Sequence, residues 1–301
     1  MRRTLATLVW CWALAGCSAG SINPRQACVR EALDRPLLHD GVAVFTGEGG
    51  GVSEARSGWL NRRDGTTVMA VASLTKPLVA AEIRRRIDAG QLRLDQPMGA
   101  ILSSQTTSSV SAAITVQQLL QHRAGFDRRF GDPLFAADPA SCRDAAHDVL
   151  RRAPEQPLGR QVLYSNAGYC VLGEIILASP EGVDLRLLHA LKAPLGGAGG
   201  WRGSLRELHT DLLGTLPIRD LETFPALSDG SYYGYAWRHW PEGRDLPPWS
   251  HFGRLPGIVS IALSDGDRSL LVAQFRGDPP DVDIASQDAA LHLWRCLQSA
   301  S

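Results

Sequence analysis

Lysine is almost absent from this sequence. Of its 31 lysine and arginine residues, only Lys76 and Lys192 are lysine. Acidic residues also number 31, the formal net charge is zero, and the arginines are scattered in short groups. The chain therefore lacks the basic surface that nucleic acids require, and we expect no nucleic-acid partner. Because lysine, unlike arginine, can lose its proton in a protein, a retained lysine such as Lys76 is a candidate for proton transfer.

Several common catalytic and binding sequences are also missing. There is no G-x-S-x-G elbow, no H-E-x-x-H zinc motif and no Walker A sequence. The glycines at residues 47–51 lack the spacing and the following helix of a phosphate-binding loop, so they predict a hairpin turn. The cysteines lack the spacing of metal ligands. We therefore expect neither a metal nor another cofactor.

The N-terminal segment resembles an export signal. A charged start precedes an apolar run at residues 5–14 that is too short for a comfortable membrane span. Leu-Ala-Gly-Cys at residues 14–17 resembles the lipobox of bacterial lipoproteins, in which cleavage precedes an acylated cysteine. The resemblance implies that residues 1–16 are removed and that Cys17 carries the lipid anchor. Ser18 in place of aspartate implies the outer membrane, facing the periplasm; an ordinary secretory signal is the alternative.

Four further cysteines are expected to form disulfides. An even number of cysteines in an exported chain indicates disulfides in preference to a zinc site. Cys28 lies near the mature start and Cys296 in the last predicted helix, so we expect this pair to clamp the two ends. Cys142 and Cys170 would then form the second pair.

Apolar periodicity predicts strands at both ends of the chain and helices between them. The order predicts an α+β fold, in which an antiparallel sheet is assembled from both chain ends and a helical region is inserted. We expect a sheet subdomain of residues 24–72 and 232–301 and a helical subdomain of residues 73–231. Expected strands are residues 41–45, 58–60, 232–240, 257–263 and 269–275. Expected helices are residues 26–34, 74–90, 115–122, 141–152, 167–176 and 284–297.

The signals are weak between residues 185 and 227. Gly-Gly-Ala-Gly-Gly at residues 196–200 predicts a flexible turn.

Ser-Leu-Thr-Lys at residues 73–76 begins one of the predicted helices. At a separation of three residues, the side chains of Ser73 and Lys76 lie on one helix face. The first turns are nearly all apolar, and burial favours the neutral form of an amine. A neutral amine could take the proton of the serine hydroxyl and make it a nucleophile. Taken alone, a chance pair at the foot of a surface helix explains the spacing equally well.

Two later sequences are candidates for the same site. Tyr-Ser-Asn occupies residues 164–166 and His-Phe-Gly occupies residues 251–253. Taken alone, the first is more often a turn and the second a packed strand. His122 follows a predicted helix and is expected to cap it or to pack, in preference to acting as a catalytic base.

In this order, the three sequences resemble the motifs of the serine beta-lactamase and penicillin-binding-protein superfamily. The resemblance is to its class C branch, which includes D,D-peptidases and beta-lactamase-like carboxylesterases. It runs from about residue 41 to the C-terminus and implies the beta-lactamase/transpeptidase-like α/β sandwich. Supporting segments lie at residues 90–95, 119–125 and 232–237.

The resemblance also implies roles for individual residues. Ser73 would attack a carbonyl and form an acyl-enzyme, and Lys76 would accept or relay its proton. Tyr164 would act as general base and pass the proton to the leaving group. Asn166 would orient Lys76 or bind a substrate amide. The backbone N–H groups of Ser73 and Arg254 would form the oxyanion hole.

His251 stands where true class C beta-lactamases have a lysine, and histidine is familiar at this place among D,D-peptidases and related esterases. Imidazole is largely neutral at pH 7, so we expect weak recognition of a substrate carboxylate. Gly253 would let its strand approach the substrate closely. The helical region between Tyr164 and Asp229 looks shorter than in relatives, which leaves the pocket size open.

These features lead us to expect a serine hydrolase that cleaves an ester or a D-amino-acid peptide, with weak or no beta-lactamase activity. The substrate would be a small molecule or a peptidoglycan peptide, and the membrane would be reached through the lipid anchor. A true beta-lactamase is one alternative. A non-catalytic cell-wall-binding lipoprotein that retains the fold is another.

Overall fold

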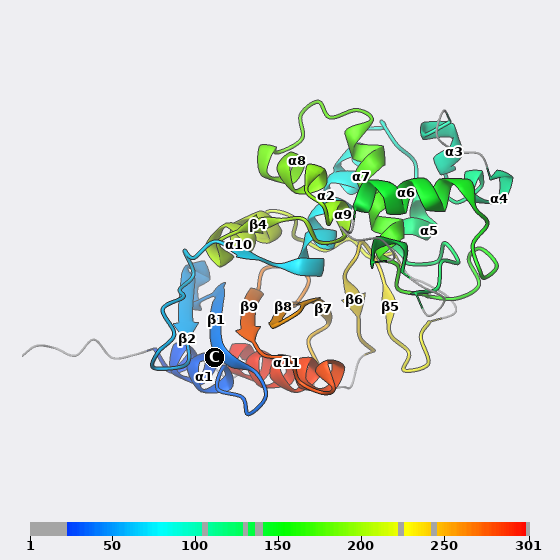
Figure 1. Cartoon of the computed structure of the whole chain (residues 1–301). Coiled ribbons are helices and arrows are strands. Elements are labelled where there is room, and N and C mark those ends of the chain that lie inside the picture. Colours follow the sequence, from blue (N-terminus) through cyan, green and yellow to red (C-terminus); the bar gives the residue numbers. More distant parts are fainter. Residues whose placement is uncertain are drawn as a thin grey trace, which may run out of the picture.

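Strands from both ends of the chain lie side by side in one antiparallel sheet of seven strands (Figure 1). Its order is β2-β1-β9-β8-β7-β6-β5. The computed structural model describes residues 23–103, 108–128, 132–135, 141–221, 226–241 and 246–298. Cys17 and the rest of the predicted export signal lie outside the described residues. The strands are β1 (His39–Thr46), β2 (Val52–Arg56), β5 (Tyr232–Tyr233), β6 (Arg238–His239), β7 (Trp249–Leu255), β8 (Ile258–Ser264) and β9 (Leu270–Arg276).

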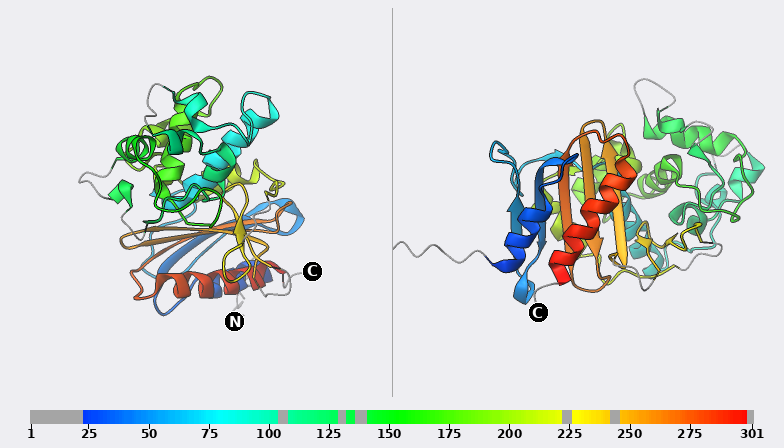
Figure 2. Two further views of the ribbon diagram at one scale, coloured as in Figure 1. Left: turned by 90° about the vertical axis from the view of Figure 1, so that its right-hand side faces the viewer. Right: turned by 90° about the horizontal axis from the view of Figure 1, so that it is seen from below.

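Two helices from opposite ends of the chain cover one face of this sheet (Figure 2). They are α1 (Pro24–Ala32) and α11 (Val282–Gln298). Alternate residues of the strands, such as Phe45 and Ile261, are buried against them. A disulfide joins Cys28 of α1 to Cys296 of α11, with the two Cα atoms 5.5 Å apart. This is the pairing expected from the sequence.

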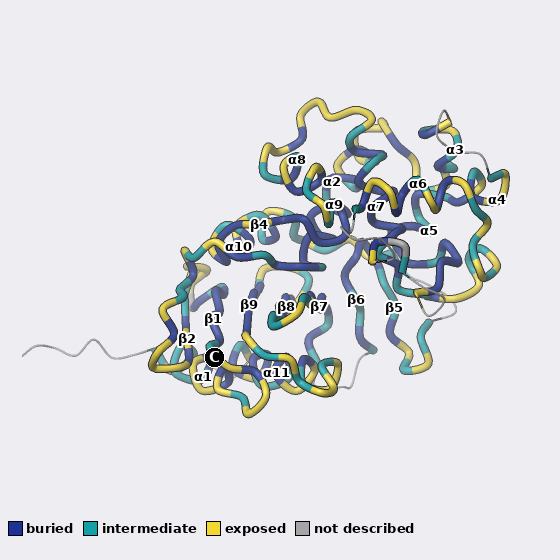
Figure 3. The backbone as a smooth tube through the Cα atoms, viewed as in Figure 1, coloured by how far each residue is buried: buried dark blue, intermediate teal, exposed yellow. Residues whose placement is uncertain are grey.

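A helical region covers the other side of the sheet (Figures 1 and 2). At its centre lies α2 (Thr75–Asp88), which is buried along most of its length (Figure 3). The second expected disulfide, between Cys142 and Cys170, joins α6 to α7. The other helices and short helical turns are α3 (Met98–Ile101), α4 (Ser109–Ala112), α5 (Val116–Leu120), η4 (Pro133–Phe135), α6 (Cys142–Arg151), α7 (Asn166–Leu177), α8 (Leu185–Lys192) and α9 (Gly196–Gly199).

The chain crosses from sheet to helical region through a second, two-stranded sheet. It pairs β3 (Met69–Ala70) with β4 (Arg202–Gly203). After β4, α10 (Leu205–Leu213) returns to the main sheet, where His209 Nε2 lies 3.2 Å from the carbonyl oxygen of Leu270 in β9. α10 therefore packs on the sheet although it lies within the segment expected to be helical subdomain.

Three local predictions are wrong. Residues 232–240 do not form one strand, because the chain turns back on itself and β5 pairs antiparallel with β6, with Tyr232 opposite His239. The second strand is β2 at Val52–Arg56, and residues 58–60 form a loop, because β1 and β2 pair directly across the short turn η1 (Glu48–Gly50). The glycine-rich residues 196–200 do not form a flexible turn: they form the buried helical turn α9. A Cβ on Gly200 would come 2.2 Å from the carbonyl oxygen of Ala190, so close packing requires glycine here.

No helix in the described part of the chain is both long and apolar enough to cross a bilayer.

Candidate active site

Ser73 lies in a tightly held turn at the start of α2. The turn is η2 (Ala72–Leu74), and Ala72 has a φ of 51°, in the left-handed region that alanine rarely adopts. Thr75 Oγ1 donates to the carbonyl oxygen of Ala72 at 2.8 Å and accepts from the backbone N–H of Trp201 at 3.0 Å. These bonds stabilise a strained backbone, which is common where a side chain must be aimed at a reactive position.

Lys76 lies one helical turn beyond Ser73 and is completely buried. Its Nζ lies 2.9 Å from Ser73 Oγ, 2.8 Å from Asn166 Oδ1 and 2.7 Å from the carbonyl oxygen of Ala198. The predicted pair of hydroxyl and amine is thus formed, and two carbonyl-type oxygens complete the surroundings of the amine.

Burial lowers the pKa of Lys76 to about 7, with the charge of Asp132 opposing this shift and that of Arg128 adding to it. A large fraction of the amine is therefore neutral near neutral pH. A neutral amine has two N–H groups and one lone pair. The oxygens of Asn166 and Ala198 can only accept hydrogen bonds, so they take both N–H groups. The lone pair is left for the hydroxyl of Ser73, which is the arrangement that a general base requires.

Asn166 is held in the orientation that serves Lys76. It is the first residue of α7, where Ser165 caps the helix by accepting from the backbone N–H of Gly168 at 3.0 Å. Its amide Nδ2 donates to Asp132 Oδ2 at 2.7 Å. Because the nitrogen of the amide is committed to a carboxylate, its oxygen must face the lysine. Asp132 thereby fixes the second partner of Lys76.

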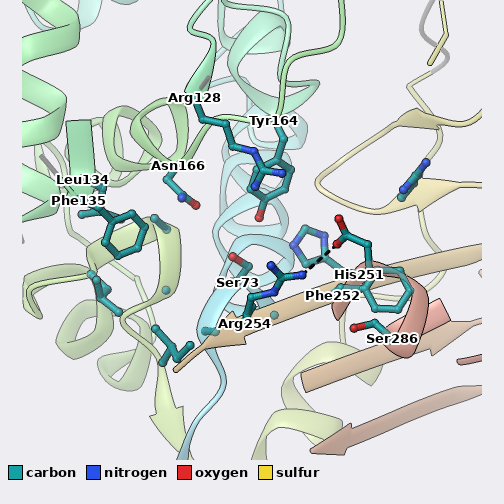
Figure 4. A pocket seen from close by; sticks show the side chains of 18 of the residues that line it. Ser73, Arg128, Leu134, Phe135, Tyr164, Asn166, His251, Phe252, Arg254 and Ser286 are labelled. Carbon is teal, nitrogen blue, oxygen red and sulfur yellow. Dashed lines mark hydrogen bonds and ion pairs between the residues drawn. The ribbon is translucent and has the colours of Figure 1, made fainter. Parts of the chain in front are cut away.

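Tyr164 lies on the opposite side of Ser73 from the strands, with its hydroxyl directed toward Ser73 (Figure 4). Lys76 Nζ lies 5.0 Å from its ring centroid and Arg128 Cζ lies 5.5 Å from it. Burial and the nearby Tyr233 raise the pKa of Tyr164 above its ordinary value, while the contact with Ser73 and the charge of Arg128 oppose the rise. The phenol therefore stays protonated near neutrality, which favours Lys76 over Tyr164 as the first proton acceptor.

His122 packs behind Tyr164 instead of facing Ser73. Its ring centroid lies 4.4 Å from that of Tyr164 and 4.8 Å from that of Tyr233. Its Nδ1 accepts from the backbone N–H of Ser165 at 3.1 Å. Burial lowers its pKa well below the ordinary value, so the ring is neutral. These contacts fit the packing role expected from the sequence.

Strand β7 forms the other wall and carries His251, Gly253 and Arg254. Strand β6 pairs only with Trp249 and Ser250 of β7, so the rest of that edge is open to η2. A Cβ on Gly253 would come 2.6 Å from the carbonyl oxygen of Val71 and 3.1 Å from the backbone nitrogen of Ser73. Only glycine allows the strand to pass this close to the serine.

His251 is buried and has its one N–H committed elsewhere. Its Nδ1 lies 2.9 Å from the carbonyl oxygen of Ala236, and a carbonyl can only accept, so the proton of the neutral ring is on Nδ1. Burial and then the charge of Lys76 lower the pKa of His251 to about 3, against the opposing influence of the Ala236 and Ser73 backbone. Neutral His251 therefore has no N–H left for a substrate carboxylate.

A cleft of about 820 Å³ opens above Ser73. Tyr164, Asn166 and Arg128 line its helical side, and the His251 to Pro256 segment lines its strand side (Figure 4). At its mouth, the Arg254 guanidinium lies 3.2 Å from Asp283 Oδ1 of α11. In the described part of the chain, no group of three or more histidine, cysteine, aspartate or glutamate side chains could hold a metal ion.

The structure thus brings together the sequence-predicted residues of all three motifs around one cleft. Sequence reasoning missed the partners that set their chemistry, which are Asp132, Ala198 and Ala236. Asp132 lies outside the three motifs, and two of the three partners act through backbone oxygens. A backbone oxygen leaves no signal in the residue type.

Comparison with known proteins agrees with this geometry. The family model for beta-lactamase matches residues 31–184, which is just over half of the chain. The chain belongs to the beta-lactamase family. A probable fimbrial assembly protein, FimD of serogroup H1 from Dichelobacter nodosus, is 31% identical over 165 residues, covering 50% of this chain and 40% of that protein. This chain thus matches less than half the length of that relative.

Solved structures of low sequence identity share the fold of this beta-lactamase family member. The D-amino acid amidase from Ochrobactrum anthropi SV3, complexed with L-phenylalanine, superposes with a TM-score of 0.69 at 16% identity, covering 92% of this chain and 98% of that chain. A beta-lactamase/D-alanine carboxypeptidase from Pseudomonas syringae gives a TM-score of 0.69 at 17% identity, with the same coverage. At these identities the likeness shows a shared fold.

Proposed function

We propose that the protein cleaves an ester or an amide of a D-amino acid through an acyl-enzyme on Ser73, with weak or no beta-lactamase activity. The observation that carries this proposal is the set of three contacts around Lys76, which leaves the lone pair of the amine for the Ser73 hydroxyl. A carbonyl carbon in the cleft is the electrophile that such a nucleophile attacks.

The proton moves from Ser73 to the leaving group in two stages. Neutral Lys76 takes the Ser73 proton as Oγ bonds to the carbonyl carbon. Tyr164 gives its phenolic proton to the departing nitrogen or oxygen as that bond breaks, and Lys76 then returns a proton to Tyr164. In deacylation, water replaces the leaving group and the same steps run in reverse, which restores Ser73.

The oxyanion is stabilised by backbone groups on both sides of the serine. We assign the N–H groups of Ser73 and Arg254 to this role, because Gly253 allows β7 to pass close to η2. Removing one such donor from an enzyme of this kind typically costs on the order of 100-fold in kcat.

One observation favours an ester or D-aminoacyl substrate over a beta-lactam. His251 offers neither a charge nor a free N–H at the place where a cation would bind the carboxylate of a beta-lactam. Much faster hydrolysis of nitrocefin than of 4-nitrophenyl esters would contradict this preference.

The expected lipid anchor belongs to the same proposal. With Cys17 acylated, the cleft would face the periplasm and meet peptidoglycan peptides or small esters there. Fractionation of cells that express the full chain tests this step. The protein should sediment with outer membranes, and Cys17→Ser should release it into the periplasm; an unchanged distribution would contradict the anchor.

Covalent labelling tests the catalytic core of the proposal. A fluorophosphonate should add one adduct to the intact protein, and peptide mapping should place it on Ser73. The Ser73→Ala variant should show no adduct, whereas Ser103→Ala, which removes an exposed hydroxyl outside the cleft, should label like the wild type. Equal labelling of Ser73→Ala would contradict the assignment.

A further inference from the structure

We infer that Arg128 is the anion receptor of this site and that the preferred substrate carries a carboxylate on the helical side of the cleft. The inference rests on the proposed acyl-enzyme function and names the substrate class. It follows from the charges around the cleft, of which three are arginines that line it: Arg128, Arg238 and Arg254.

Two of these arginines already have carboxylate partners. Arg254 lies 3.2 Å from Asp283, and Arg238 lies 2.6 Å from Asp229 while its guanidinium also packs over the Trp240 ring. A substrate carboxylate would have to compete with these partners.

Arg128 differs from both. No carboxylate of the described residues lies within ion-pair distance of its guanidinium, whose Cζ lies over the ring of Tyr164, 5.5 Å from the centroid. Arg128 is exposed and borders the cleft close to Asn166 (Figure 4). A guanidinium near an aromatic face and without a carboxylate partner keeps its N–H groups available, and their fork matches a carboxylate in a two-bond arrangement.

The strand side of the cleft cannot offer the same interaction. The ring of His251 is neutral, and its Nδ1–H is bonded to Ala236. The negative group of a substrate would therefore bind above Tyr164. The apolar side chains of Leu134 and Phe135 line the cleft beyond Asn166, away from Tyr164 (Figure 4), and offer a separate place for an apolar group of the substrate.

A pair of esters that differ in one group tests the inference. Phenylacetylglycine esterified to 3-hydroxybenzoate carries a carboxylate, and the same ester of 3-hydroxybenzamide carries a neutral group of equal size. The wild type should prefer the carboxylate ester. The comparison is made at pH 9, where Lys76 stays largely neutral with or without the charge of Arg128. In Arg128→Gln, kcat/KM for the carboxylate ester should fall about tenfold or more, as expected for loss of a hydrogen bond to a charged group, while the value for the carboxamide ester stays within twofold.

Two further variants separate this role from others. Arg128→Lys keeps the charge without the two-bond geometry and should lose an intermediate part of the preference. Arg268→Gln removes the same charge from the exposed turn before β9, outside the cleft, and should change neither ester. An equal loss for both esters in Arg128→Gln would show that Arg128 acts through Tyr164 and would overturn the inference. No loss for either ester would overturn it as well.

Failure of the proposed function gives a different result. Each protein is also treated with an uncharged fluorophosphonate, and its adduct is located. If the wild type labels at Ser73 but shows no preference between the esters, the anion receptor is refuted while the nucleophile stands. If Ser73 is not labelled, the proposed function itself is refuted.

Discussion

Lys76 and His251 flank Ser73, and the difference between them shows how equal burial produces unequal chemistry. Both side chains are withdrawn from water, and burial lowers both pKa values, to about 7 for Lys76 and about 3 for His251. Two oxygens take the N–H groups of Lys76 and leave its lone pair for Ser73, whereas one oxygen takes the single N–H of His251. Lys76 can therefore exchange protons with Ser73, whereas His251 forms part of the cleft wall.

Of the changes considered, replacing Lys76 should reduce activity the most. Lys76→Arg keeps a cation, but the guanidinium does not release its proton, so the general base is lost. We expect kcat/KM for a neutral ester to fall by about 1,000-fold, within the usual range for a general base. Steady-state kinetics with 4-nitrophenyl acetate measures this. The Lys192→Arg control should behave as the wild type, and Lys76→Arg activity above a tenth of wild type would exclude Lys76 as the base.

Removing Asp132 should have the next largest effect. In Asp132→Ala, Asn166 loses the bond that turns its oxygen toward Lys76, and kcat should fall by roughly tenfold. The charge of Asp132 raises the pKa of Lys76, so its removal lowers that pKa further from its value of about 7. The acid limb of the kcat/KM profile should move to lower pH.

The direction of that movement distinguishes an electrostatic role of Asp132 from a structural one. Asp95→Ala removes an exposed carboxylate that pairs with Arg93 and should leave both kcat and the limb unchanged. A limb that stays in place in Asp132→Ala, with the same loss of kcat, would contradict the assigned role.

His251 should have a smaller effect and no influence on the pH profile. Because its pKa is about 3, His251 does not titrate between pH 5 and pH 9, and the acid limb near pH 7 belongs to Lys76. His251→Gln should lower kcat/KM for a neutral ester by roughly threefold, a typical size for the loss of one neutral hydrogen bond. The limb should remain near pH 7, and its disappearance would show that the histidine is the titrating group.

Removing either disulfide should lower stability, but only one of the two removals should lower kcat. Removing either pair by double replacement with serine should cost about 2–4 kcal/mol of stability and lower Tm, as measured by calorimetry. The Cys142–Cys170 bond joins α6 to α7, and α7 begins with Asn166, so its loss should also reduce kcat by about twofold. The Cys28–Cys296 bond lies across the sheet from Ser73, and its loss should leave kcat unchanged. Equal effects on kcat would contradict this distinction.

The sequence correctly predicted the main helices and strands around the site. Short apolar runs located β8 and β9 within one residue, and apolar periodicity located α2 and α11. The three motifs also identified the residues that meet around Ser73. These predictions succeeded because each depends on residue types at short separations.

The remainder depended on contacts between distant segments. Ala198 reaches Lys76 only because the glycines of α9 allow it to pack against η2, and these glycines had suggested flexibility. Asp132 and Arg128 lie in a segment whose residue types give no period and no motif. The neutrality of His251 follows from its burial and from the Ala236 carbonyl, neither of which residue types reveal.

The central claim is that Lys76 is a base near neutral pH, and the scarcity of lysine makes it directly measurable. Protein labelled with ¹⁵N-lysine contains only two Nζ atoms, and the Lys192→Arg variant leaves that of Lys76 alone. Titration of its ¹⁵Nζ resonance should give a midpoint near pH 7. A midpoint near 10, where an ordinary lysine titrates, would contradict the account.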